Sequence, residues 1–184
     1  MYSKSRIQLL SNQEIESIYA MPQFNKTVRA LYFSLTDNEM RLVKKYRTIK
    51  AKVYLIRLLG YFKAKQQFYK FDLAYNNVDT QSILEKYFEE SLLPLSGKIN
   101  FKTYFFQKND IFTLLHYQDW SSTHEPKIQL RINELLKLYP KGHDTLRQLL
   151  NYFDTQQIVV PSYRTLQDLF TKAFSQEQQF PPTH

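Results

Sequence analysis

The sequence contains no cysteine, only three glycines and no apolar run long enough to cross a bilayer. Without cysteine, disulfides and thiolate metal sites are excluded. Without a run of about 18 apolar residues, no transmembrane helix is expected. The first residues also lack the apolar stretch and small-residue cleavage site of a secretory signal. We therefore expect a cytoplasmic protein with no membrane partner.

The motifs that carry catalysis are missing as well. Gly60, Gly97 and Gly142 cannot form a glycine loop that cradles phosphates. The four histidines have no ligand-like spacing, and the acids are scattered rather than patterned for two-metal chemistry. No nucleophile motif surrounds any serine. We expect no metal, no cofactor and no catalytic activity in this chain.

What the sequence does have is positive charge, and that charge is local. The formal net charge is +8. Residues 41–70 carry ten Lys and Arg and no Asp or Glu, whereas the rest of the chain carries 15 bases and 17 acids. A local positive field with interleaved tyrosines is typical of a polyanion partner, most often nucleic acid.

The apolar spacing predicts an all-α fold, a bundle of about nine helices. A hydrophobic content of 43% is enough for a real core. Three segments fit the capping box that begins a helix: Ser11–Glu14, Thr36–Glu39 and Ser122–Glu125. The helices are expected at 12–20, 25–34, 37–46, 49–69, 80–91, 101–116, 123–139, 144–156 and 163–178. Only residues 158–160 look strand-like, and they are too few to found a sheet.

The least helical interior stretch, residues 72–79, predicts a joint between two subdomains. It follows the basic segment and precedes a more acidic one. We expect a basic helical subdomain at 1–72 and a second helical subdomain at 73–184. Each is expected to contain one helix-turn-helix-like unit.

The first of these units is predicted where a short turn joins the basic helix to the helix before it. On a helical wheel the basic helix has an apolar side and a stripe of Lys, Arg and Tyr. Cations neutralise phosphates, and tyrosine offers a hydroxyl or a stacking face. The predicted DNA contacts of turn and stripe are Arg41, Lys44, Lys45, Arg47, Lys50, Tyr54, Arg57, Tyr61 and Lys65. An ordinary solvated helix face would give the same pattern.

The second unit is predicted near the C-terminus, in residues 146–177. A leucine-rich helix is followed by a tight apolar link, and Pro161-Ser162 then opens another helix. In a helix-turn-helix, the first residues of the second helix reach base edges, and arginine commonly reads guanine. The candidates here are Ser162, Tyr163, Arg164 and Thr165. A plain helical hairpin that closes the core stays open as an alternative, and Trp120 is expected to anchor a core rather than stack on bases.

Several blocks of the sequence together resemble a known family. The blocks are residues 10–24 (LSNQEIESIYAMPQF), 29–36 (RALYFSLT), Arg47, 53–63 (VYLIRLLGYFK) and 158–167 (IVVPSYRTLQ), with Ala173 and Glu177 further on. In order and spacing they resemble the N-terminal region of Tn-three family transposases, the large enzymes of class II replicative transposons. The resemblance covers essentially the whole chain, and residues 104–120 fit it more loosely.

The resemblance implies a function. In that family this region is helical and binds the terminal inverted repeats of the transposon, whereas the catalytic carboxylate triad and its magnesium lie far downstream. The chain then looks like a non-catalytic, nucleoid-associated portion of a transposase. Its expected partners are double-stranded transposon ends and the remainder of a full-length transposase. The resemblance puts Arg47, Tyr54, Arg57 and Lys63 in the first binding unit and Pro161, Tyr163 and Thr165 in the second.

Two other functions stay open at this point. A protein-interaction or regulatory module that pairs with full-length transposase would expose an apolar patch. A structured-RNA binder would prefer A-form or single-stranded targets and stack bases on its tyrosines. On the DNA-binding hypothesis, Arg57→Ala weakens binding to all DNA, whereas Arg164→Ala mainly erodes the preference for the cognate end.

Overall fold

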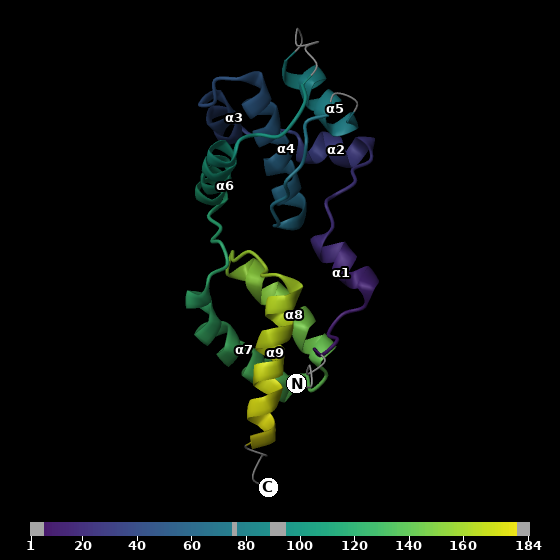
Figure 1. Cartoon of the computed structure of the whole chain (residues 1–184), viewed down its shortest axis with the longest axis vertical. Coiled ribbons are helices and arrows are strands. Elements are labelled where there is room, and N and C mark those ends of the chain that lie inside the picture. Colours follow the sequence, from purple (N-terminus) through teal and green to yellow (C-terminus); the bar gives the residue numbers. More distant parts are fainter. Residues whose placement is uncertain (1–5, 75–76, 89–94, 180–184) are drawn as a thin grey trace. The chain divides into compact units, whose positions relative to one another are not determined.

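The computed structural model describes residues 6–74, 77–88 and 95–179. Within these residues the chain forms nine α-helices and one 3₁₀ helix, and its only β-structure is an isolated bridge between Gln118 and Ile158 (Figure 1). The expected all-α class is confirmed for this part of the chain. The helices belong to two compact units, one of residues 21–117 and one of residues 1–20 and 118–184.

The charge is divided unequally between the two units. Residues 21–117 contain 16 Lys and Arg against eight Asp and Glu, and we call them the basic unit. Its helices are α2 (Lys26–Tyr32), α3 (Asp37–Lys44), α4 (Ile49–Lys65), α5 (Val78–Tyr87) and α6 (Phe101–Leu115). The other unit contains nine of each sign, and we call it the neutral unit. Its helices are α1 (Asn12–Tyr19), η1 (Ser122–His124), α7 (Glu125–Leu138), α8 (Gly142–Thr155) and α9 (Tyr163–Gln179).

The division expected at residue 72 does not coincide with these units. Phe71 stacks on Tyr54 of α4 with 4.2 Å between the ring centroids. Leu73 is fully buried, and its N–H donates a hydrogen bond to the Gly97 carbonyl at 3.1 Å. The segment after the basic helix therefore packs back onto that helix and belongs to the same core. A polar, weakly helical stretch marks a loop, and a loop does not by itself mark a domain boundary.

Helix ends follow the sequence signals in most places. The capping boxes at Ser11–Glu14 and Thr36–Glu39 are both present. The box expected at Ser122–Glu125 is wrong, because a 3₁₀ turn begins at Ser122 and Ser121 caps it. The basic helix ends at Lys65 rather than at residue 69, since Gln66 adopts left-handed backbone with φ 49°. The expected end of the fifth helix at residue 91 lies outside the described residues.

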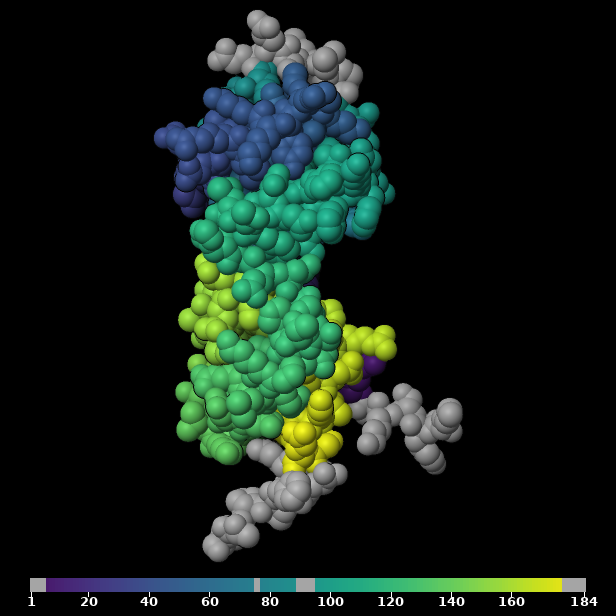
Figure 2. Space-filling view, turned by 90° about the vertical axis from the view of Figure 1, so that its left-hand side faces the viewer, coloured from purple at the N-terminus to yellow at the C-terminus, as the bar shows by residue number. Residues whose placement is uncertain are grey.

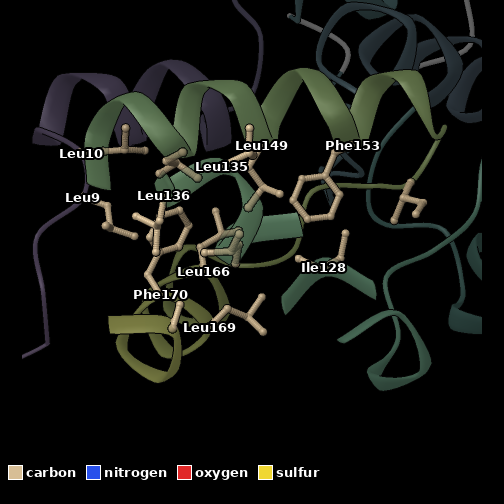
Figure 3. Packing of buried hydrophobic residues seen from close by; sticks show 14 residues of the cluster. Leu9, Leu10, Ile128, Leu135, Leu136, Leu149, Phe153, Leu166, Leu169 and Phe170 are labelled. Atoms are coloured by element: carbon tan, nitrogen blue, oxygen red, sulfur yellow. The ribbon is translucent and has the colours of Figure 1, made fainter. Parts of the chain in front are cut away.

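The neutral unit is built around a mainly aliphatic core (Figure 3). Leu149 and Phe153 of α8 point toward Leu166 of α9 and Ile128 of α7. Trp120 packs against this core and meets Phe153 edge-on at 6.0 Å, which confirms the expectation that it anchors a core. Burial of such a set of aliphatic side chains is the main stabilising force for this unit.

The core of the basic unit surrounds α4 and mixes aliphatic side chains with several large aromatic ones. Phe33, Tyr54, Tyr61, Phe62 and Phe71 are all buried there. Helix α4 packs against α2, α3, α5 and α6. From Val53 to Phe62 every residue of α4 is buried, so the helix has no broad solvent face along this length.

Candidate nucleic-acid interface

Four exposed cations gather at the end of α3 and in the turn before α4. They are Arg41, Lys44, Lys45 and Arg47, which we call the turn cluster. Leu42 and Val43 on the same helix are buried, so α3 turns its apolar side to the core and its basic side to solvent. None of the four forms an ion pair with a described residue; Arg41 only donates to the Asn38 side chain at 3.3 Å.

The turn that carries this cluster is held in place from both sides. The Tyr46 hydroxyl donates to Asp110 Oδ2 on α6 at 2.8 Å. Burial, reinforced by the Asp110 carboxylate, raises the pKa of Tyr46 well above its usual value. The Thr48 side chain caps α4 by accepting from the Ala51 N–H at 3.1 Å. Helices α3 and α6 lie side by side on one face of the basic unit (Figure 2). The turn cluster is therefore supported by packed helices and by these hydrogen bonds.

The expected stripe of DNA contacts along α4 is wrong for its three central members. Tyr54, Arg57 and Tyr61 are only 2%, 3% and 1% exposed. The wheel assigned one apolar side to this helix, whereas four neighbouring helices cover it all round. These three side chains cannot reach a duplex in the folded protein, and they act in the core instead.

Arg57 and Tyr61 belong to a buried polar network around Asp79. Tyr61 donates to Asp79 Oδ2, and Arg29 Nε donates to Asp79 Oδ1 at 2.6 Å. Arg57 Nε donates to the Tyr61 hydroxyl at 2.9 Å, and its guanidinium lies 4.3 Å from the centroid of the Phe71 ring. Burial, together with the Asp79 hydrogen bond, raises the pKa of Tyr61, so it stays a neutral donor. One carboxylate therefore helps to hold two arginines in this core.

The remaining cations of the expected stripe lie at the two ends of α4. Lys50 is in the first turn of α4. Its ammonium lies 3.6 Å from the position that a Cβ atom added to Gly97 would occupy. Lys63 donates to Glu39 Oε1 and to the Ser34 carbonyl, both at 3.1 Å. Lys50 and Lys65 are about 22 Å apart along the helix axis, since each residue rises about 1.5 Å. The predicted residues therefore do not form one continuous surface.

At the start of α9 the four predicted side chains divide into three that serve the fold and one that does not. The Tyr163 hydroxyl accepts from the N–H groups of Leu9 and Leu10 at 2.9 and 3.1 Å. Ser162 caps the helix by accepting from the Thr165 N–H at 3.2 Å, and the two hydroxyls lie 2.9 Å apart. Arg164 is exposed and has no hydrogen-bond or ion-pair partner among the described residues. Of these four, Arg164 is the one available to read a base.

A second candidate surface, which the sequence patterns did not predict, lies on α6 and combines exposed rings with lysines. Phe101, Phe105 and Phe106 are 74%, 51% and 51% exposed, large fractions for phenylalanine. Lysines accompany them, and the Lys102 ammonium lies 5.9 Å from the Phe106 ring centroid. The signal in the sequence was the run FKTYFFQK, which has too many rings for one buried helix side. Exposed rings beside cations suit both nucleic acid and protein partners.

Within the described residues no helix is long and apolar enough to cross a membrane, and no group of three His, Asp or Glu side chains could hold a metal ion. The described residues form two all-α units, and one of the two is strongly basic. Residues 9–173 match the family described as "Domain of unknown function (DUF4158)", and the chain belongs to that family. No match was found among curated proteins.

Proposed function

We propose that this chain is the non-catalytic DNA-binding portion of a transposase of the Tn-three type, which recognises transposon terminal inverted repeats. The carrying observation is that the whole net charge of +8 falls in one unit. That unit presents the turn cluster without ion pairs, and an unpaired cation group of this kind attracts DNA phosphates. The resemblance of sequence blocks across the whole chain to Tn-three transposases indicates which DNA is bound, the terminal inverted repeats of a transposon.

In this proposal the two units have different tasks. The basic unit provides most of the affinity through phosphates, a sequence-independent term that falls steeply with salt. The neutral unit provides discrimination through the start of α9, where Arg164 is exposed. The catalytic carboxylates of the transposase are expected outside this chain, which acts by binding alone.

The test removes charge from the basic unit and, in a matched control, from the neutral unit. Lys44→Ala, Lys45→Ala and Arg47→Ala are combined in one variant, and Lys137→Ala, Lys141→Ala and Lys172→Ala in the other; all six side chains are exposed. Fluorescence anisotropy measures binding to a terminal-repeat duplex and a scrambled duplex at several salt concentrations. We expect the first variant alone to lose affinity and to lower the salt slope by up to about 3, from about 0.9 per phosphate contact.

Other results would contradict the proposal. Equal losses in the two variants would mean that net charge acts without a specific surface. Absence of binding to either duplex would remove the DNA function, and preference for a hairpin RNA over both duplexes would favour the RNA alternative.

A protein-interaction module is a second candidate, favoured by the three exposed phenylalanines of α6. It predicts association that increases with concentration. Sedimentation equilibrium of the wild-type chain and of Phe105→Ala with Phe106→Ala would detect it. A monomer at all concentrations, together with no binding of the wild-type chain to a full-length transposase, would exclude this candidate.

A further inference from the structure

A small pocket opens in the basic unit, beside the exposed face of α6. Its lining comes from α4, from the segment that follows α4, from the loop before α6 and from the first turn of α6. The lining residues are Tyr54, Lys70, Phe71, Lys98, Ile99, Phe101 and Tyr104, and the volume is about 200 Å³. Drug-sized ligands occupy pockets of about 300 Å³ or more, so this one has room for a single planar ring system.

The walls of the pocket are aromatic and firmly held. Tyr54 and Phe71 stack with an interplanar angle of 17°, and Tyr104 meets Tyr54 edge-on at 6.3 Å. Tyr54 and Phe71 are buried, so this floor is rigid. Phe101 at the rim is 74% exposed, so most of its ring is open to solvent. A planar ring entering here would meet aromatic surface on several sides.

The cations at the pocket are placed for an anion attached to that ring. The Lys70 ammonium lies 5.9 and 5.6 Å from the ring centroids of Phe101 and Tyr104. Lys98 is exposed, and neither lysine forms an ion pair with a described residue. The Lys50 ammonium lies beside Gly97, the residue before Lys98. The Leu73 N–H fixes this loop through its 3.1 Å hydrogen bond to the Gly97 carbonyl.

We infer that this pocket binds one unpaired nucleobase of a DNA strand, stacked against its rings, with the adjoining phosphate at Lys70 and Lys98. Stacking on an aromatic side chain tolerates any base, because every base has a π-face. An uncharged aliphatic chain would make no use of the ammonium groups, and a base pair is too large for a pocket of about 200 Å³. The inference rests on the proposed function for the choice of DNA, and it adds recognition of a distorted or opened duplex.

The experiment compares two labelled duplexes of one sequence, the second with a single extra unpaired adenine in the middle. Fluorescence anisotropy measures both with the whole chain, with Phe101→Ala and with Phe105→Ala, a matched control on the same helix that does not line the pocket. Wild type should prefer the bulged duplex by at least about fivefold, from the lower end of base–aromatic stacking. Phe101→Ala should lose this preference with binding to the paired duplex unchanged, and Phe105→Ala should keep it. Lys98→Ala should reduce the preference more than Lys102→Ala.

Each contrary result has a separate meaning. Equal, salt-sensitive binding of both duplexes by wild type would overturn the pocket and leave the proposed DNA function intact. Binding of neither duplex would overturn both. Loss of the preference in both phenylalanine variants would assign it to the surface of α6 rather than to the pocket. Saturable binding of free deoxyadenosine monophosphate without a bulge preference would make the pocket a nucleotide site and overturn the assignment to DNA.

Discussion

The two units reach a stable fold by different means. The basic unit contains 19 of the 29 aromatic residues, and all three buried charged side chains of the described residues, Glu39, Arg57 and Asp79, lie in it. The neutral unit buries mainly aliphatic side chains, with Phe153 and Phe170 among them, and its ion pairs lie at the surface. The positively charged side chains of the basic unit are therefore of two kinds, buried ones that stabilise the core and exposed ones that are free to bind a partner. Exposure and pairing separate the cations that hold the core from those that are free to bind.

The largest effect should come from the buried network of the basic unit. Asp79→Asn removes the carboxylate that accepts from both Arg29 and Tyr61. An arginine left buried without its counterion is costly, and breaking such a pair typically destabilises a protein by about 3–5 kcal/mol. Denaturant unfolding followed by circular dichroism measures the loss.

The control for this variant lies in the neutral unit. Asp168→Asn breaks the ion pair of Asp168 with Arg6, which is 3.3 Å long and largely exposed. Exposed pairs contribute about 0–1 kcal/mol, so this change should be small. A similar loss in the two variants would refute the idea that the basic unit alone depends on buried charge.

Close packing of α4 gives the next effect. A methyl group on Gly60 would lie 2.5 Å from the Phe33 ring, which is itself buried. Gly60→Ala should therefore destabilise the chain by about 1–3 kcal/mol through overpacking. In the neutral unit, the matched Gly142→Ala would meet a Leu9 methyl at 3.1 Å, which a small side-chain rotation can relieve. Denaturant unfolding of both variants tests this order, and an equal cost would show that close approach to Phe33 is not the cause.

The sequence was sufficient to predict the all-α class and the positions of most helices, but it was not sufficient to predict that α4 is buried on all sides. Capping boxes and apolar spacing are local signals, and they hold at Ser11 and Thr36. Burial of Arg57 depends on partners far along the chain, the carbonyl of Asp72 and the hydroxyl of Thr80, which no helical wheel contains. The turn cluster could be predicted because exposure at a helix end is the default for cations. The pocket could not, because its lining comes from three stretches that are far apart in the sequence.

The sequence suggested that Arg57 provides affinity for all DNA and that Arg164 provides preference for the cognate end. In the structure Arg57 is buried in the basic unit, whereas Arg164 is exposed on the neutral unit. Arg57→Ala should lose DNA binding only as far as it unfolds the basic unit, since Arg57 is 3% exposed. Arg164→Ala should leave folding intact and reduce the preference for the cognate end by about 1–3 kcal/mol. Anisotropy at matched folded fraction measures both. Equal loss on cognate and scrambled duplex for Arg164→Ala would remove its role in reading bases.

The smallest effect concerns pH and belongs to the surface of the neutral unit. His143 Nε2 lies 2.8 Å from Glu14 Oε1, with Asp144 at 3.5 Å from Nδ1 and Arg147 at 3.3 Å from the same Glu14 oxygen. The hydrogen bond to Glu14, followed by that to Asp144, raises the pKa of His143. The hydrogen bonds that Glu14 makes with His143 and Ser11 lower the pKa of Glu14 to about 2.

The sign of each contribution follows from its direction. The raised pKa of His143 stabilises the fold below the ordinary histidine value of about 6.5, and this stabilisation is lost as the pH rises through the folded-state pKa. The lowered pKa of Glu14 stabilises the fold above about 4.3 and is lost as the pH falls toward 2. His143→Gln should therefore lower Tm slightly at pH 5.5 and leave it unchanged at pH 8.5. His116→Gln, an exposed histidine at the end of α6, is the control and should show no such difference. If His143→Gln lowers Tm equally at the two pH values, this histidine stabilises the unit by packing and not by its charge.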